Sequence, residues 1–135
     1  MDSGHWDLSH VGEFDPSKWF GFIYAIEDHI TQKAYIGKKF FTHKRQKTKA
    51  NKSRTKESDW RTYCSSCDPL VEAIKERGKQ DFRFLILQLC SGRCELSYTE
   101  QQTQFQHDVL RATLPNGEPK FYNRTIAHFN FAGLA

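Results

Sequence analysis

Two tyrosines, Tyr24 and Tyr35, lie eleven positions apart, each inside a short run of β-branched and aromatic residues. The runs cover residues 22–26 and 34–36 and flank a polar turn, so the pattern predicts a β-hairpin. A tyrosine at the same place in both strands brings two hydroxyl groups to the hairpin, and such groups could act on a water molecule. The alternative is that both rings are cross-strand packing partners, as aromatic residues often are.

A block of basic residues follows the hairpin. Nine lysines and arginines and no acidic residue lie between Lys38 and Lys56, whereas the first 17 residues hold four acidic residues and no basic one. Such a block favours phosphate binding. The alternative is a solvated or disordered loop, because like charges repel and cannot bury a core. The candidates for contact with nucleic acid are Lys39, His43, Lys44, Lys47, Lys49, Lys52 and Arg54, with Arg61 in the next segment.

The four cysteines form two closely spaced pairs, Cys64-x2-Cys67 and Cys90-x3-Cys94. Ligand pairs at these spacings can chelate, and the gap between them suits the two halves of a structural zinc site. Cys90 also ends an apolar run, where a buried cysteine is ordinary. A zinc site is therefore one hypothesis, and separate reduced cysteines are the other.

The elements that would position these groups begin with the hairpin, over residues 18–39. A long basic loop follows over residues 38–57, and residues 58–63 form a short helical turn. The next segment is a helix, because Asp68-Pro69 offers a capping residue with an early proline and Gly78 supplies the stop.

The second half of the chain adds one strand and one helix. Residues 82–89 are apolar and β-prone, which predicts a buried third strand. Residues 96–110 have a helix-like period with an inward set of Leu96, Phe105, Val109 and Leu110. This order predicts an α/β fold with a small three-stranded sheet, mixed or antiparallel, flanked by helices.

The chain of 135 residues is long enough for one domain with a single modest core. We expect an N-terminal arm over residues 1–17, extended or loosely docked, a domain over residues 18–126 and a tail over residues 127–135. No apolar run is long enough to span a bilayer, and the N-terminus is not a secretory signal. A soluble intracellular protein with reduced cysteines is therefore expected.

The sequence also resembles a known family. Phe22-Ile23-Tyr24 and Tyr35-Ile36-Gly37 are similar to the two halves of the GIY-YIG nuclease signature, at the family's usual spacing. The resemblance covers residues 19–126 and looks closest to phage-encoded Seg-type endonucleases, through Tyr-Ile-Gly-Lys-Lys-Phe-Phe and a later Ser-Asp-Trp. Phe22 departs from the signature, which has glycine at that position. Further positions that match the family in order are Lys38, Arg45, Glu100 opening a helical stretch, and Asn123.

The resemblance implies a metal-dependent endonuclease that hydrolyses phosphodiester bonds of DNA by tyrosine-assisted attack of water. Glu100 would be the one protein ligand of Mg²⁺ or Mn²⁺, since Mg²⁺ often needs a single carboxylate plus substrate phosphate. Tyr35 or Tyr24 would act on the water, and Lys38 is the cation nearest in sequence to Tyr35 that could depress its pKa. Arg45 would neutralise the scissile phosphate, with Arg61 as the alternative, and Asn123 would hold the geometry or touch substrate.

Two other functions stay open. One is a catalytically silent nucleic-acid-binding module of the same fold, and the other is a zinc-stapled interaction domain in which the tyrosines only pack. The expected partner is nucleic acid, above all double-stranded DNA, with no membrane. We expect no separate DNA-recognition domain, and specificity would then be low or would come from the basic loop, a homodimer or a recruiting protein. A phage-encoded protein would work in the cytoplasm of the host cell.

Overall fold

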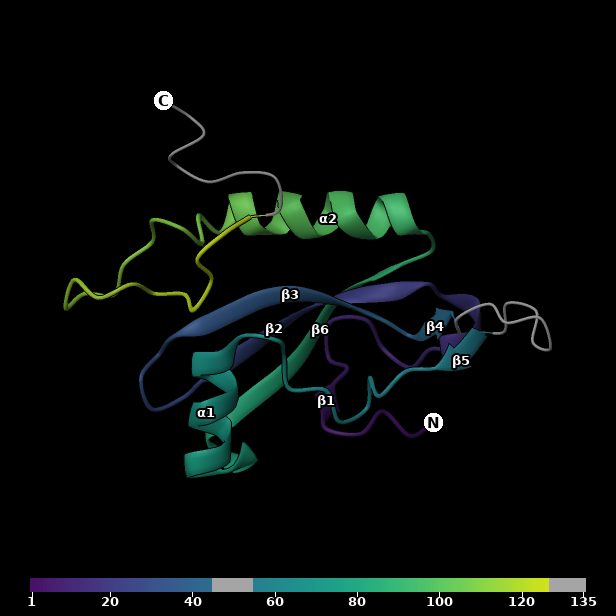
Figure 1. Cartoon of the computed structure of the whole chain (residues 1–135), viewed down its shortest axis with the longest axis horizontal. Helices are drawn as coiled ribbons and strands as arrows, with labels where there is room; N and C mark the ends of the chain where they lie inside the picture. Colours follow the sequence, from purple (N-terminus) through teal and green to yellow (C-terminus); the bar gives the residue numbers. More distant parts are fainter. Residues whose placement is uncertain (45–54, 127–135) are drawn as a thin grey trace.

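The computed structural model describes residues 1–44 and 55–126 of the chain. One mixed sheet has the strand order β1-β6-β2-β3, with β1 at Trp6–Asp7, β2 at Gly21–Asp28, β3 at Ala34–Phe40 and β6 at Phe82–Cys90. β2 is antiparallel to β3 and β6, whereas β1 runs parallel to β6. The α/β class is confirmed. The sheet has four strands instead of the predicted three, because two residues near the N-terminus pair with β6 (Figure 1).

The turn between β2 and β3 is built around Asp28. Its carboxylate accepts hydrogen bonds from the backbone N–H groups of Ile30 at 3.0 Å and Thr31 at 3.2 Å, a common turn-forming arrangement. Arg77, the last residue of α1 (Asp68–Arg77), grips the same carboxylate. Burial opposes ionisation of Asp28, but the guanidinium and the turn N–H groups outweigh it and lower its pKa to about 2. The hairpin is thereby fastened to α1.

The helix α1 agrees with its sequence signals. It ends where Gly78 takes a positive φ of 86°, and the Gly78 N–H donates to the Ile74 carbonyl at 2.8 Å. Glycine tolerates this backbone conformation at a helix end. Two short 3-10 helices, η1 (Pro16–Lys18) and η2 (Lys79–Asp81), lead into β2 and β6.

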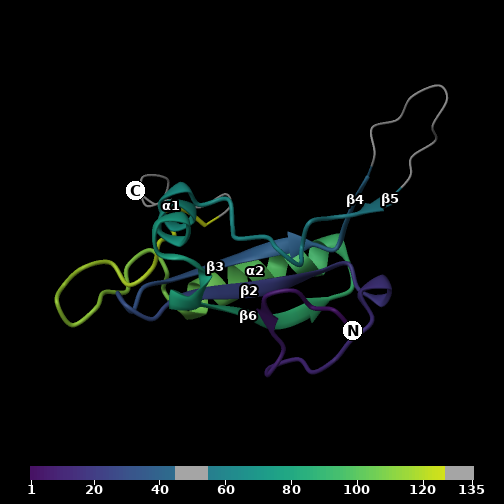
Figure 2. The ribbon, with the colours of Figure 1, turned by 90° about the horizontal axis from the view of Figure 1, so that it is seen from below.

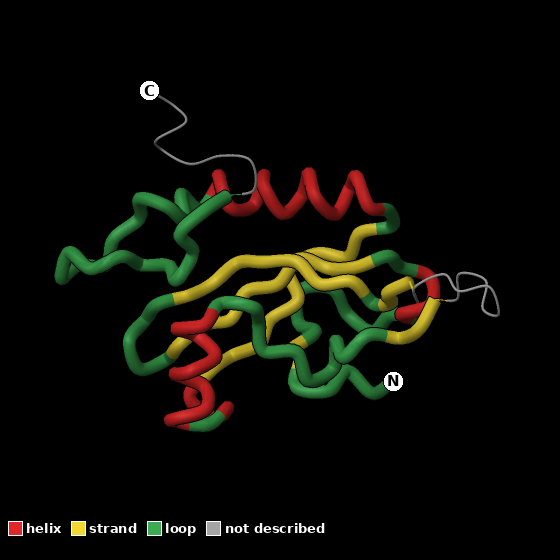
Figure 3. Tube along the Cα trace, in the orientation of Figure 1, coloured by secondary structure: helices red, strands yellow, loops and turns green. Residues whose placement is uncertain are grey.

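The two faces of the sheet differ in composition and in cover (Figure 3). We call one the aromatic face; the N-terminal arm, residues 58–67 and α1 pack against it. The other, the aliphatic face, is covered by α2 (Arg93–Gln106) on the opposite side of the sheet from α1 (Figure 1). The aromatic core includes Trp6, Phe22, Tyr24, Phe41, Trp60 and Phe84, and the aliphatic core includes Ile23, Ile36, Leu96, Val109 and Ile126.

The predicted inward set of α2 is only partly confirmed, because Phe105 points outward and Val109 and Leu110 lie beyond the end of the helix. Leu96 and Val109 are buried, but Phe105 is 51% exposed and the helix ends at Gln106. Phe105 comes nine residues after Leu96, so at about 100° per residue it lies half a turn away. Thr99 and Gln104 are buried instead.

The described ends of the predicted basic loop are strands. β4 (Thr42–Lys44) and β5 (Thr55–Glu57) form an antiparallel pair in which His43 lies opposite Lys56. This ribbon lies at the opposite end of the molecule from α1 (Figure 2). Within residues 1–44 and 55–126, no helix is both long and apolar enough to cross a membrane.

Candidate active site

The hairpin places Tyr24 and Tyr35 on the aromatic face, with ring centroids 6.1 Å apart. Gly37 lies opposite Tyr24 in the strand register. A Cβ at Gly37 would come within 2.7 Å of the Tyr24 hydroxyl oxygen and 2.9 Å of the Tyr35 ring. Glycine therefore permits the two phenol rings to converge. Phe22, which replaces the first glycine of the signature, is fully buried in the aromatic core.

Both tyrosines have a raised pKa. Burial is the main cause for each, and Tyr24 is only 1% exposed. Negative charge on Cys67 and Glu100 would raise the pKa of Tyr35 further. The sequence analysis expected Lys38 to lie beside Tyr35 and depress its pKa, and this expectation is wrong. Side chains alternate along a strand, so Lys38 points to the aliphatic face while Tyr35 and Gly37 point to the aromatic one.

Lys38 meets Glu100 of α2 instead. Its Nζ lies 3.8 Å from Glu100 Oε1 and donates a hydrogen bond to Ser97 Oγ at 3.2 Å. The Lys38 backbone N–H also donates to the Glu100 carboxylate. Burial raises the pKa of Glu100, whose side chain is 14% exposed, and both Lys38 interactions partly offset this. Glu100 lies near the middle of α2, so the prediction that it opens a helical stretch is wrong.

Asn123 is buried and bonded to the backbone of β3. Its Oδ1 accepts from the Ile36 N–H at 3.1 Å, and its Nδ2 donates to the Ile36 carbonyl at 2.8 Å. Gln104 of α2 donates to the same carbonyl at 2.9 Å. Asn123 thus fixes the strand between Tyr35 and Gly37. Gln104 was not predicted from the sequence as a residue of this site. The available signal was its position four residues after Glu100, which places both on one side of a helix.

The outer edge of β3 is covered at every second residue. The Ala34 N–H donates to the Lys120 carbonyl at 3.0 Å, and the Ala34 carbonyl accepts from the Tyr122 N–H at 2.8 Å. Asn123 then pairs with Ile36, and Glu100 with the N–H of Lys38. The carboxylate is therefore attached to the edge of the strand that carries Tyr35.

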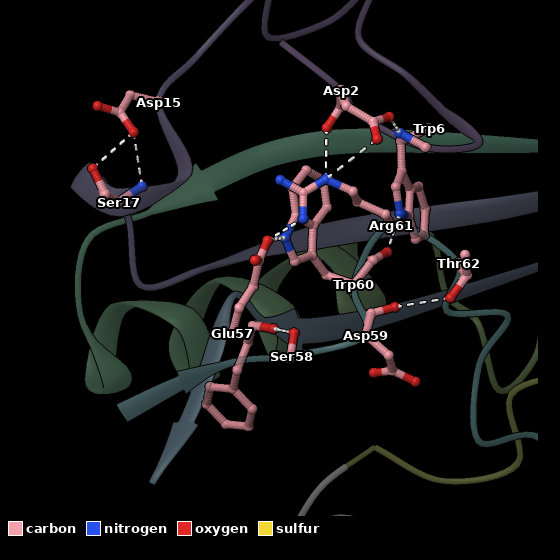
Figure 4. A network of polar contacts seen from close by, with 12 residues as sticks. Asp2, Trp6, Asp15, Ser17, Glu57, Ser58, Asp59, Trp60, Arg61 and Thr62 are labelled. Carbon is pink, nitrogen blue, oxygen red and sulfur yellow. Dashed lines mark hydrogen bonds and ion pairs between the residues drawn. The ribbon is translucent and has the colours of Figure 1, made fainter. Parts of the chain in front are cut away.

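The two candidate arginines have different outcomes. Arg45 lies outside the described residues, as do Lys47, Lys49, Lys52 and Arg54. The Arg61 guanidinium lies over the Trp60 ring, with Cζ 4.5 Å from its centroid, and pairs with Glu57 and Asp2 (Figure 4). These contacts tie Arg61 to the N-terminal arm and not to the tyrosine pair.

Other predicted nucleic-acid contacts lie on β3 and β4. Lys39 of β3 points to the aromatic face, where its Nζ lies 2.7 Å from Asp59 Oδ1 and 3.9 Å from the centroid of the Tyr63 ring. His43 is exposed on β4, and Lys44 ends that strand. Lys39 thus lies on the same face of β3 as Tyr35.

The cysteines do not gather into one site. Cys64 and Cys67 pack against the aromatic core, Cys90 is buried in the aliphatic core, and Cys94 is exposed on α2. Among the described residues, which include all four, no group of three or more His, Cys, Asp or Glu side chains could hold a metal ion. The predicted four-cysteine zinc site is therefore wrong.

The described structure brings together Tyr24, Tyr35, Lys38, Glu100 and Asn123, all around β3, and leaves Arg61 apart. Comparison with protein families gives one match that covers most of the chain. The family model described as "Putative endonuclease segE, GIY-YIG domain" matches residues 6–126. No curated protein and no solved structure gives a significant match.

Proposed function

The chain belongs to the Seg-type GIY-YIG endonuclease family, and from this premise we propose that it hydrolyses phosphodiester bonds of double-stranded DNA with one divalent cation held at Glu100. The observation that carries the proposal is the approach of Glu100 to Tyr35 across the edge of β3. Negative charge on Glu100 would raise the pKa of Tyr35, and Lys38 Nζ, which lies 3.8 Å from Glu100 Oε1, joins the carboxylate to the strand that carries the tyrosine.

The donors at this site fit a hard cation that keeps most of its water. Glu100 is the one carboxylate at this point, and the described residues contain no closed cluster of ligands. Mg²⁺ and Mn²⁺ suit such a site, because a single carboxylate plus substrate phosphate can hold them. Once bound, the cation would supply positive charge to the scissile phosphate and the leaving oxygen.

The surrounding residues have separate tasks. Lys38 and its backbone N–H favour the ionised form of the Glu100 carboxylate and partly offset the effect of burial on its pKa. Tyr35 stays protonated at neutral pH because its pKa is raised, so it orients the attacking water by hydrogen bonding and is not a preformed tyrosinate. Asn123 fixes the backbone between these groups. Arg45 stays the candidate for neutralising the phosphate, and the basic residues Lys39, His43, Lys44, Lys47, Lys49, Lys52 and Arg54 are proposed to contact the DNA backbone.

Glu100→Gln tests this proposal. The variant keeps the shape of the side chain and a hydrogen-bond acceptor for Lys38 but removes the charge. We expect the rate of nicking of supercoiled plasmid in Mg²⁺ to fall about a hundredfold or more, as is typical when a single electrostatic group is removed. Duplex affinity should persist, because it comes mainly from basic side chains on phosphates.

Glu72→Gln is the matched control, since Glu72 is exposed on α1. It should nick at the wild-type rate, and both variants should unfold at the wild-type urea midpoint. Wild-type activity in Glu100→Gln would overturn the assignment of the cation to Glu100.

A second function, a catalytically silent DNA-binding module, is favoured by one observation. Arg61, the described candidate for neutralising the phosphate, is held by Glu57 and Asp2 away from the tyrosine pair. A silent module would bind duplex DNA with a strong salt dependence and would not nick plasmid in Mg²⁺ or Mn²⁺. Nicking by wild-type protein that chelator abolishes would exclude it.

A further inference from the structure

A five-residue segment, Tyr63–Cys67, lies over the tyrosine pair. The Tyr63 ring meets the Tyr24 ring edge-on, with centroids 6.0 Å apart, and the Ser65 hydroxyl interacts with the Tyr24 oxygen. The Ser66 side chain makes the corresponding hydrogen bond to Tyr35. Each tyrosine hydroxyl therefore has a partner from this segment.

Ser65 holds an unusual backbone conformation at this point. Its φ is 100°, a value that side-chain-bearing residues rarely adopt and that costs about 1–3 kcal/mol. Its Oγ accepts a hydrogen bond from the Cys67 N–H at 3.0 Å. That bond leaves the single hydroxyl proton of Ser65 free to point to the Tyr24 oxygen. The strained residue thus sets the direction of hydrogen bonding at Tyr24.

Tyr24 itself has almost no exposed surface, whereas Tyr63 is half-buried. The hydroxyl of Tyr24 is bonded to the Tyr63 side chain as well as to Ser65. On the other side of Tyr63, Lys39 Nζ lies 3.9 Å from the ring centroid. Tyr63 is therefore the member of this aromatic group that combines contact with the buried tyrosine, access to solvent and an adjacent cation.

We propose that Tyr63 and Lys39 together bind one phosphate of the DNA strand at this site, with Tyr63 donating its hydroxyl hydrogen bond to a phosphate oxygen. Lys39 supplies the charge by exchanging the Asp59 carboxylate, which lies 2.7 Å from its Nζ, for the phosphate, and Ser65 and Tyr24 fix the phenol from behind. Tyrosine and lysine side chains both serve as phosphate contacts that set the position of a protein on DNA. This inference rests on the proposed function, because it requires a nucleic acid substrate.

The test measures duplex affinity in a Glu100→Gln background, where cleavage does not interfere. Tyr63→Phe removes only the hydroxyl and keeps the ring between Tyr24 and Lys39. We expect it to weaken binding about tenfold, as for loss of a hydrogen bond to a charged group. Lys39→Met should weaken binding and reduce the slope of log affinity against log salt by about one.

Because both residues hold the same phosphate, the double variant should lose less affinity than the product of the two single losses. Tyr98→Phe, on the exposed side of α2, and Lys75→Met, in α1, are the matched controls and should bind as the parent does. All variants should keep the unfolding midpoint of the parent.

Parent-like affinity in Tyr63→Phe, or losses that multiply in the double variant, would overturn the inference. The proposed function fails by a different measurement, namely a wild-type protein that cleaves no duplex in Mg²⁺ or Mn²⁺. The two failures are therefore distinguishable.

Discussion

The two faces of the sheet are built by different means. The aromatic face is covered largely by irregular chain, namely the N-terminal arm and residues 58–67, together with the short helix α1. The aliphatic face is covered by the regular helix α2 together with the chain after it, from which Val109, Phe121 and Ile126 are buried. The two faces thus differ in that a long helix covers only the aliphatic one.

The difference explains why the candidate site lies at an edge. The phenol groups belong to the aromatic face and the Glu100 carboxylate to the aliphatic face, so a central strand would keep them apart. β3 is the last strand of the sheet, and groups from both faces can meet around it. We therefore expect substitutions in the N-terminal arm and at Gly37 to destabilise the aromatic face. We also expect the polar groups at the edge of β3 to link the two faces of the sheet.

The largest effect is expected for Trp6→Ala. Trp6 is buried among Phe22, Tyr24 and Phe84, and its indole N–H donates to the Trp60 carbonyl. Truncating a buried tryptophan typically costs about 3–5 kcal/mol. Urea unfolding monitored by circular dichroism would measure it.

Trp19→Ala is the control for Trp6→Ala, because Trp19 is 36% exposed, and it should stay within about 0.5 kcal/mol of wild type. Equal losses in both variants would mean that the arm does not belong to the aromatic core.

Asn123→Ala should cost about 2 kcal/mol, because it leaves the buried N–H of Ile36 without a partner and the carbonyl with only Gln104. The loss of register at Tyr35 and Gly37 should also lower the nicking rate. Asn116→Ala, in an exposed turn, is the control and should lower stability less. Full stability in Asn123→Ala would show that the edge is held without it.

Gly37→Ala should destabilise by about 1–3 kcal/mol, since the added methyl would overlap the two tyrosine rings. The matched change is Gly92→Ala, where the new methyl meets nothing within 4 Å. Thermal or urea unfolding compares the two. If the Gly37 variant unfolds at the wild-type midpoint, the rings do not need this close approach.

The smallest effect concerns pH. The proposed mechanism needs ionised Glu100, whose pKa burial raises, so the rate should fall as the pH drops through that raised value. Lys38→Met removes a charge that favours ionisation, and the acidic limb of the rate profile should then move to higher pH. Nicking rates from about pH 4 to about pH 8 would measure this. The control Lys75→Met should leave the acidic limb where it is in wild type. An unmoved limb in Lys38→Met as well would show that Lys38 does not affect the titration of Glu100.

Local patterns predicted much of the fold. Short-range periodicity and turn residues, which can be recognised in the sequence, predict three elements. These are the hairpin, the strand at Phe82–Cys90 and the helix at Asp68–Arg77. β1 was missed because two residues carry no period, and their partners Phe84 and Leu85 are far away in the chain.

The site was less accessible to prediction. Because side chains alternate along a strand, Lys38 and Tyr35 point to opposite faces of β3, and this could have been predicted from the sequence. Phe105 was assigned inward on its hydrophobicity although its angle from Leu96 points outward. The pairing of Asn123 with Ile36 joins residues 87 positions apart and is a consequence of tertiary packing. The role proposed for Tyr63 depends on that packing too, because its contacts are with Tyr24 and Lys39 from two different strands.

The covered edge of β3 has a consequence for solubility. An unprotected edge strand presents unpaired N–H and C=O groups to which a strand of another molecule can add, which is how many proteins begin to aggregate. Here chain segment 120–122, the Asn123 amide and the Glu100 carboxylate occupy successive outward groups of the strand. A charged side chain in such a place also repels the backbone carbonyls of an incoming strand. The glutamate proposed for catalysis therefore helps to keep the protein from polymerising through its own sheet.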